Sequence, residues 1–260
     1  MYIKIGVLSF GTPILLLLIY KAGKMVFAGI VAGGCGSRMT CSEIPKQFIE
    51  IGGEAIIIRT LKSFLAVGEI DMVYIGIKAD WHDYMDKLLA RSDIETSRVC
   101  IVDGGSDRNG TVMNIVGAIT ERFGENDDDI ILTHDAVRPF VSDKIIRDNI
   151  SAAAKFSACG TYLHAVDTIV RSDGGIVESV LDRSCLFQAQ TPQSFGVKAL
   201  RKCYAGLSDE KKALLTDTCS IFTACGEDIY IVEGDVLNFK ITTNNDLILA
   251  NAVAGLLSDK

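Results

Sequence analysis

The first strongly apolar run of the chain is followed at once by glycines and cations. The stretch VAGGCGSRMTCSEIPKQF, residues 31–48, contains Gly33, Gly34, Gly36, Arg38 and Lys46. Backbone amides of a glycine-rich loop can face phosphate oxygens, and nearby cations can neutralise the charge of those oxygens. Pro45 would hold Lys46 in a defined place. The spacing therefore predicts a phosphate site, against the plainer interpretation of a strand–helix turn with a surface arginine.

Two better-known phosphate loops do not match this stretch. The dinucleotide fingerprint G-x-G-x-x-G, started at Gly34, places Met39 where the third glycine belongs. The P-loop requires a lysine and then a serine or threonine after its second glycine, whereas Ser37 and Arg38 follow Gly36. The loop is therefore a glycine loop of another type.

Two further polar loops follow apolar runs. The first is DGGSDRNGT at 103–111, and the second lies within HDAVRPF at 134–140. The plainer interpretations are a glycine turn in which Thr111 caps a helix, and a surface pair of Asp135 and Arg138. His134 is predicted to be a hydrogen-bonded core histidine rather than a base.

Apolar runs and helical spacing alternate along the chain. Short continuous apolar runs predict buried parallel strands at 26–31, 72–77, 99–102, 130–133 and 160–165. Helical spacing is found at 56–66, 80–91, 111–123 and 143–156. This alternation predicts an α/β fold with a mostly parallel, Rossmann-like sheet. Because ligands of such sheets bind outside the carboxyl ends of the strands, the three polar loops should meet at one edge.

The pattern changes after residue 164. AVDTIVRSDGGIVESVLDRS contains two alternating runs around Asp173-Gly174-Gly175, which predicts a β-hairpin arm at about 164–183. Helices are then expected at 197–207 and 216–225, and strands at 229–233 and 239–241. Residues 25–255 are predicted to form a single domain that carries this arm.

Composition narrows the class of protein. The chain has 260 residues, 48% of them hydrophobic, and a formal net charge of −7. This charge argues against nucleic acid or an anionic membrane as the main partner. The 8 cysteines are placed singly, without zinc-type spacing, which is typical of reduced residues in a cytoplasmic protein.

The first 24 residues differ from the rest. IGVLSFGTPILLLLIY, between Lys4 and Lys21, is apolar but shorter than the roughly 20 residues that span a bilayer. A membrane anchor, an ordered extension and a working start at Met25 are all open. The last is favoured, because MVFAGIVAGG already contains a complete buried strand and its glycine turn. Membrane contact is not expected.

Eight motifs in order resemble one enzyme family. They are AGGCGSRM, PKQF, DGGSDRNGT, THDAVRPF, AVDT, DRSCLFQAQTPQSF, LTDTCSIF and NFKITT. The region 25–255 is similar to the cytidylyltransferases that activate sugar-alcohol phosphates, whose branches act on ribitol 5-phosphate or on 2-C-methyl-D-erythritol 4-phosphate. The resemblance implies a nucleotidyltransferase fold of the glycosyltransferase-A type and CMP transfer from CTP, with release of pyrophosphate.

The resemblance also implies roles for individual residues. The CTP-binding set would be Val31, Ala32, Gly33, Gly34, Cys35, Gly36, Arg38, Lys46, Gly104, Gly105, Ser106, Arg108 and Thr111. The set that binds the second substrate would be Asp135, Arg138, Asp167, Thr168, Arg183, Thr191 and Lys240. The catalytic cations would be Arg38, Lys46, Arg183 and Lys240. Mg²⁺ or another divalent cation would be held mainly by the CTP phosphates, with Asp135 able to face it.

The family pairs two subunits through the arm, so a homodimer is expected. The motifs are closer to the ribitol 5-phosphate branch, which would serve teichoic acid or capsular polysaccharide synthesis. The isoprenoid branch, acting on methylerythritol phosphate, is the alternative, and Cys35 departs from the larger polar residue common in the ribitol branch. A non-catalytic nucleotide-binding protein would usually have lost one of the cations. A glycosyltransferase would need an Asp-x-Asp motif after a strand, whereas the acidic run 127–129 precedes its strand and is predicted to be a solvated turn.

Overall fold

The computed structural model describes residues 23–34 and 44–258. Within these residues, seven strands form one sheet in the order β11-β7-β10-β6-β1-β4-β5. In chain order they are β1 (Val26–Val31), β4 (Met72–Ile77), β5 (Val99–Asp103), β6 (Ile130–Asp135), β7 (Ala158–His164), β10 (Phe187–Gly196) and β11 (Tyr230–Glu233). All neighbouring strands pair in parallel except β10, which is antiparallel to both β6 and β7. The predicted mostly parallel α/β sheet is confirmed.

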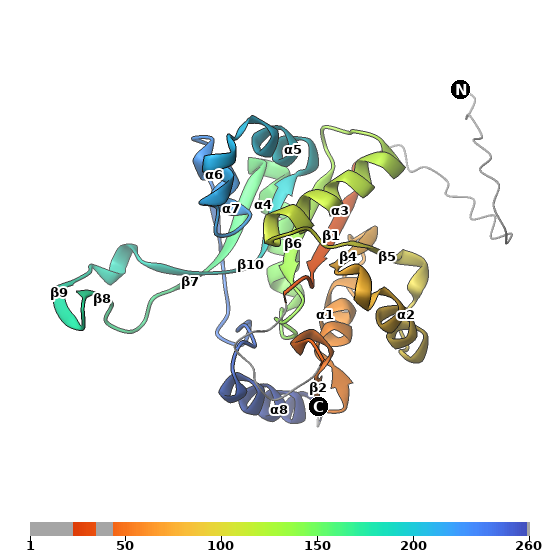
Figure 1. Ribbon diagram of the computed structural model, residues 1–260, viewed down its shortest axis with the longest axis horizontal. Helices are drawn as coiled ribbons and strands as arrows, with labels where there is room; N and C mark the ends of the chain where they lie inside the picture. The colour runs from red at the N-terminus through yellow and green to blue at the C-terminus, as the bar shows by residue number, and fades with distance from the viewer. Residues whose placement is uncertain (1–22, 35–43, 259–260) are drawn as a thin grey trace, which may run out of the picture.

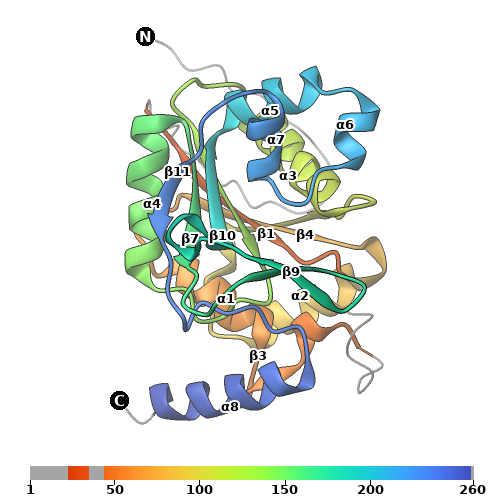
Figure 2. The same ribbon diagram turned by 90° about the vertical axis from the view of Figure 1, so that its left-hand side faces the viewer.

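Helices cover both faces of the sheet (Figures 1 and 2). One face carries α1 (Ile56–Leu65), α2 (His82–Arg91) and α4 (Asp143–Phe156), and the other carries α3 (Arg108–Phe123), α5 (Val197–Gly206) and α7 (Cys219–Ala224). Strand β1 shows why two layers form. Its side chains alternate, so that Ala28 and Ile30 pack under the first group and Phe27 under the second.

The shorter elements lie around this sandwich. They are η1 (Lys46–Phe48), β2 (Glu50–Ile51), β3 (Glu54–Ala55), η2 (Ala79–Trp81), η3 (Thr96–Arg98), η4 (Arg183–Cys185), α6 (Asp209–Ala213) and α8 (Asn244–Ser258). Helix α8 was not predicted from the sequence. It packs with Ala250 against Ile51, Val137 and Ile241 in a small separate cluster. Among the described residues, no helix has both the length and the apolarity needed to cross a bilayer.

Three sequence expectations need correction. Residues 239–241 do not form a strand, because Ile241 makes a single backbone bond to Val137 O (2.9 Å) and packs against α8. Helix α7 begins at Cys219 rather than at 216, since the preceding residues form a hydrogen-bonded turn. The acidic run 127–129 is not wholly solvated, because Asp129 is buried and accepts from Met25 N (2.8 Å).

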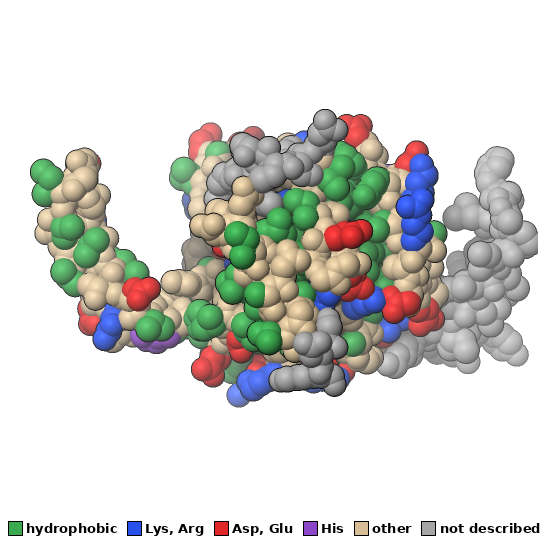
Figure 3. Space-filling view, turned by 90° about the horizontal axis from the view of Figure 1, so that it is seen from below, with side chains coloured by type: hydrophobic (Ala, Val, Ile, Leu, Met, Phe, Trp, Pro, Cys, Tyr) green, Lys and Arg blue, Asp and Glu red, His purple; other side chains and the backbone are tan. Residues whose placement is uncertain are grey.

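The predicted arm is present as β8 (Val170–Asp173) and β9 (Ile176–Val180), which pair antiparallel. Gly174 and Gly175 both have positive φ (56° and 87°), as a tight two-residue hairpin turn requires. The arm stands away from the body (Figure 1), and the space-filling view shows hydrophobic side chains along it (Figure 3). Val170, Ile176, Val177 and Val180 are all exposed. A two-stranded hairpin without a core is marginal in water, so this surface is suited to a partner.

Candidate active site

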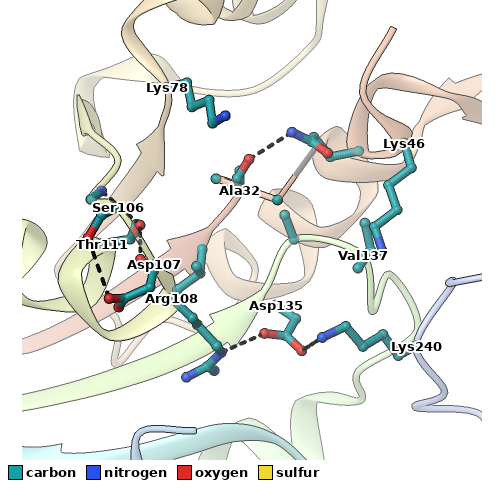
Figure 4. Close-up of a pocket in the computed structure, with 16 residues that line it drawn as sticks. Ala32, Lys46, Lys78, Ser106, Asp107, Arg108, Thr111, Asp135, Val137 and Lys240 are labelled. Carbon is teal, nitrogen blue, oxygen red and sulfur yellow. Dashed lines mark hydrogen bonds and ion pairs between the residues drawn. The ribbon is translucent and has the colours of Figure 1, made fainter. Parts of the chain in front are cut away.

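A cavity of about 360 Å³ lies at the carboxyl edge of the sheet. Its walls come from the segments after β1, β4, β5 and β6, from η1, and from the segment after β11 (Figure 4). The lining residues are Val31, Ala32, Gly33, Gly34, Lys46, Gln47, Lys78, Gly105, Ser106, Asp107, Arg108, Thr111, Asp135, Ala136, Val137 and Lys240. The expectation that the polar loops meet at one edge is confirmed.

The glycine loop and Lys46 are joined through Gln47. The Gln47 side chain donates to Ala32 O at the end of β1 (2.7 Å) and is itself buried. The next residue, Phe48, packs its ring against Trp81 and Tyr84, with centroids 5.3 and 4.5 Å apart. These contacts hold η1 against the body and bring Lys46 to the cavity wall. Cys35, Gly36 and Arg38 lie outside the described residues.

The loop after β5 is closed by its own hydrogen bonds. Asp107 is the N-cap of α3 and accepts from Gly110 N (2.8 Å). The Thr111 hydroxyl donates to Asp107 O and accepts from Gly105 N, both at 2.9 Å. Thr111 is therefore not the helix cap that the plainer interpretation of this loop supposed. Gly104 is held by a bond to Ile77 O (2.7 Å) and does not line the cavity.

Asp135, at the end of β6, is the electrostatic centre of the cavity. Its carboxylate accepts from Arg108 Nε (3.1 Å) and lies 2.8 Å from Lys240 Nζ. In Figure 4 these two cations approach it from opposite sides. Arg138 Nε lies behind, 3.7 Å from the second carboxylate oxygen. Burial alone would raise the pKa of Asp135, but Arg108, Lys240 and Arg138 hold it well below its usual range. Asp135 is thus ionised at neutral pH.

His134 is a hydrogen-bonded core residue, as predicted. Burial lowers the pKa of His134 to about 3, so the ring is neutral. Its Nε2 lies 3.1 Å from Arg138 O, which can only accept, so Nε2 carries the proton. Its Nδ1 then accepts from the Thr191 hydroxyl (3.0 Å), which in turn accepts from Asp135 N (3.1 Å). This series of hydrogen bonds fixes the Asp135 backbone and leaves His134 without a free lone pair for base catalysis.

Several expected substrate residues are not on the cavity wall. Thr191 and Arg138 are both buried behind Asp135, and Arg138 Nη1 donates to Asn238 O (2.7 Å). The structure therefore places both residues as supports of Asp135. Asp167 and Thr168 are exposed at the base of the arm. Arg183 is exposed there as well, donating to Val166 O (2.7 Å), and is absent from the walls of its own chain's cavity.

Three polar lining residues were not predicted from the sequence: Gln47, Lys78 and Asp107. Lys78 directly follows β4, and Figure 4 shows it across the cavity from Asp135. The rule applied to the other strands, that ligands lie beyond their carboxyl ends, would have identified it. Asp107 stands inside the DGGSDRNGT motif, where a helix N-cap signal was available.

The lining carries more positive than negative groups. Lys46, Lys78, Arg108 and Lys240 face Asp107 and Asp135. Such a cavity can hold a polyanion, because cations and backbone amides at a water-excluded site stabilise developing negative charge. Among the described residues no cluster of three or more histidine, cysteine or acidic side chains could enclose a metal ion. Asp135 lies on the cavity wall, and a carboxylate oxygen there fits a divalent cation that is held mainly by phosphate oxygens.

A family model confirms the resemblance. The model described as IspD, 2-C-methyl-D-erythritol 4-phosphate cytidylyltransferase, matches residues 26–255. The chain belongs to this family. It is therefore an IspD-type cytidylyltransferase, a nucleotidyltransferase, and the glycine loop, the cavity and the arm all lie within the matched region.

Solved structures agree in fold. The 4-diphosphocytidyl-2C-methyl-D-erythritol synthase of Anaerococcus prevotii DSM 20548 is 29% identical, with a TM-score of 0.73 over 89% of this chain and 96% of that one. The 2-C-methyl-D-erythritol 4-phosphate cytidylyltransferase of Francisella tularensis is 28% identical, with a TM-score of 0.73 over 88% and 99%. That of Thermus thermophilus is 26% identical, with a TM-score of 0.69 over 89% and 99%. The nucleotidyltransferase sheet is shared along the whole IspD region.

Proposed function

We propose that this IspD-family enzyme transfers CMP from CTP to 2-C-methyl-D-erythritol 4-phosphate, in the synthesis of isoprenoid precursors. The observation that carries the proposal is the family match over 26–255. It is supported by the Francisella tularensis structure, whose name states this substrate, and by the Anaerococcus prevotii structure, whose name states the product 4-diphosphocytidyl-2C-methyl-D-erythritol. The competing substrate is ribitol 5-phosphate, for teichoic acid or capsular polysaccharide. The ribitol 5-phosphate hypothesis is favoured by the residues of four motifs, AGGCGSRM, GGSDRNGT, THDAVRPF and LTDTC. The methylerythritol hypothesis rests on the broader match.

The proposed reaction needs no covalent protein intermediate. A phosphate oxygen of the acceptor attacks the α-phosphorus of CTP while the bond to the bridging oxygen of the β-phosphate breaks, and pyrophosphate leaves. Two anions must meet, so positioning and cations supply most of the catalysis. Lys46 and Arg38 would stabilise the charge on the triphosphate, and Lys240 would meet the acceptor phosphate beside Asp135. The neutral His134 is not required as a base, because the attacking phosphate is already ionised.

Mg²⁺ or a similar divalent cation is part of the proposal. When bound, it would neutralise charge on the triphosphate and on the leaving pyrophosphate. Asp135 is the protein group proposed to face it. The Arg108 and Lys240 contacts of Asp135 hold the carboxylate in one orientation toward the cavity.

We also propose that the arm makes a homodimer with shared active sites. The arm exposes apolar side chains, and Arg183 is not on its own chain's cavity wall. A twofold-related copy would cover the apolar side chains and could bring its Arg183 to the acceptor phosphate. Arginine is suited to this role, because its planar guanidinium binds phosphate with two parallel hydrogen bonds.

The substrate is tested by following pyrophosphate release with CTP, Mg²⁺ and each acceptor in turn. The proposal predicts that kcat/KM for 2-C-methyl-D-erythritol 4-phosphate exceeds that for ribitol 5-phosphate at least about tenfold, or about 1.4 kcal/mol. A reversed preference would assign the enzyme to the ribitol branch. If neither acceptor supports pyrophosphate release, both substrate assignments are wrong.

The shared site is tested by mixing two inactive variants, Arg183→Ala and Lys46→Ala. If Arg183 acts across the interface, random exchange makes about half the dimers mixed, each with one intact site, so about a quarter of wild-type activity returns. Recovery of no activity would place both residues in the same site. A monomeric but fully active wild type would exclude sharing altogether.

A further inference from the structure

A buried glutamine in β10 holds the turn that precedes α7. Gln193 is 1% exposed. Its Nε2 donates to Asp217 Oδ2 (2.5 Å), and its Oε1 accepts from the backbone amides of Thr218 (3.0 Å) and Cys219 (3.3 Å). Both ends of the amide are therefore used by one turn. The turn is completed by Ser220, whose backbone amide donates to Asp217 Oδ1 (2.8 Å).

The same turn holds the first residues of α3. Thr218 Oγ1 accepts from Arg108 Nη1 (2.6 Å), and Asp217 O accepts from the Asn109 side chain (3.3 Å). Arg108 Nε donates at the same time to Asp135 Oδ1 (3.1 Å). The guanidinium is thus held on two sides, by the turn and by the central carboxylate of the cavity. Its remaining nitrogen, Nη2, is buried and has no partner among the described residues.

The chemistry of this contact selects an amide at position 193. Asp217 offers a carboxylate that only accepts, whereas the backbone nitrogens of Thr218 and Cys219 only donate. Glutamine supplies one donor and one acceptor at the right length. A glutamate would set a second carboxylate against Asp217, and an apolar side chain would leave the buried groups of the turn unpaired.

We propose that Gln193 is a positioning residue for Arg108. It fixes the Asp217–Thr218 turn, and the turn orients the guanidinium that lines the nucleotide cavity. Without it, the turn would hold Thr218 Oγ1 less firmly against Arg108 Nη1, and the guanidinium could rotate about its contact with Asp135. The kcat/KM for CTP would therefore be lower, although Gln193 itself is not on the cavity wall. This inference rests on the proposed CTP site.

The test exchanges donor and acceptor across the hydrogen bond. Gln193→Glu should lower kcat/KM for CTP by about tenfold or more, since it removes a hydrogen bond to the charged Asp217 and places a second carboxylate beside it. Adding Asp217→Asn restores a donor opposite the introduced glutamate and leaves an oxygen for the Ser220 amide. The double variant should return to within about threefold of wild type. A double variant as impaired as the single one would overturn the proposal.

A second comparison separates positioning from simple structural support. In an Arg108→Ala background, Gln193→Glu should change kcat/KM by less than about twofold, while its effect on the melting temperature persists. Gln190→Glu is the matched control. It alters a buried glutamine of the same strand that bonds Asp235 and Asn238 instead. Its effect should be the same with or without Arg108.

Equal losses from Gln193→Glu in both backgrounds would also refute the proposal. If Gln193→Glu does not fold, Gln193→Met gives the same comparison, because it removes the bonds without adding a charge. The coupling can also be measured in the CTP dissociation constant, which needs no acceptor. A wild type that binds CTP but uses neither polyol phosphate would therefore contradict the proposed substrates and leave the coupling measurable. A wild type that does not bind CTP would contradict both.

Discussion

Replacing Asp135 by asparagine should destabilise the protein more than any loss of a surface charge. The carboxylate is buried, and its oxygens lie 2.8 Å from Lys240 Nζ, 3.1 Å from Arg108 Nε and 3.7 Å from Arg138 Nε. An asparagine in its place would keep the shape of the side chain but remove the negative charge that compensates these three cations. The change therefore isolates electrostatics from packing.

The size of the effect follows from the contacts. Two unit charges about 4 Å apart attract by about 4 kcal/mol at an effective dielectric constant of about 20. Solvent screens part of this, because the Lys240 side chain is 39% exposed, and the cost of burying the carboxylate offsets another part. Removing one partner from a buried ionic cluster typically costs about 3–5 kcal/mol. We expect this loss in the free energy of unfolding, a large share of the about 5–15 kcal/mol of a typical domain.

The assay is urea unfolding at pH 7, followed by circular dichroism, for the wild type, Asp135→Asn and a matched control. The control is Asp148→Asn, which removes an exposed carboxylate 2.7 Å from Lys144. Exposed pairs of this kind are worth about 0–1 kcal/mol, so the control should unfold close to the wild type. An Asp135→Asn protein within about 1 kcal/mol of the control would refute the view that this carboxylate holds the cationic cavity together.

Four further predictions concern the site and its support. Lys46→Met should lower kcat by on the order of 10²-fold, and retention of more than about a third of wild-type kcat would contradict a role in the transition state. Lys78→Met should raise KM for CTP with kcat nearly unchanged, as steady-state pyrophosphate release would show; a pure kcat effect would contradict a binding role. Gly105→Ala would place a methyl group 2.4 Å from the α3 backbone and should lower the free energy of unfolding by about 1–3 kcal/mol. Gly117→Ala is the control: its methyl group would have no neighbouring atom within 4 Å and should raise that free energy by about 0.5–1 kcal/mol, so equal melting temperatures would refute the prediction. Folding lowers the pKa of His134 to about 3, so below about pH 6.5 the unfolded chain binds a proton that the folded protein does not bind. The free energy of unfolding should therefore decrease as the pH is lowered from about 6.5, by up to about 1.4 kcal/mol per pH unit. His134→Gln should flatten this dependence in urea titrations at pH 7 and 5, and an unchanged slope would contradict the prediction.

Much of the fold could be predicted from local patterns. The apolar runs at 26–31 and 72–77 coincide with β1 and β4, because a strand buried on both faces needs apolar residues at every position. The hairpin turn at Gly174 and Gly175 was equally visible, since only a few residues accept its backbone angles. The loops were then placed by topology alone, because parallel strands direct their carboxyl ends to one edge. The family followed from the order of its motifs.

Strand β10 shows what the sequence could not determine. Its buried residues include Gln190, Thr191, Gln193 and Ser194, a composition that does not predict a central strand. These side chains are satisfied by groups far along the chain, such as Asp217 for Gln193 and Asn149 for Ser194 (3.0 Å). Burial of a polar side chain depends on such partners, and a local pattern carries no information about them.

Asp135 in the candidate active site also depends on partners that lie far along the chain. The sequence placed Asp135 at the end of a strand and made it a candidate for substrate or metal. Only the fold brings Arg108 from α3 and Lys240 from the segment after β11 to its two oxygens. Their charges, opposing the cost of burial, decide that Asp135 is ionised. The sequence therefore determined which groups reach this edge of the sheet, and the tertiary structure decided their charge and orientation, because both depend on distances between residues remote in the chain.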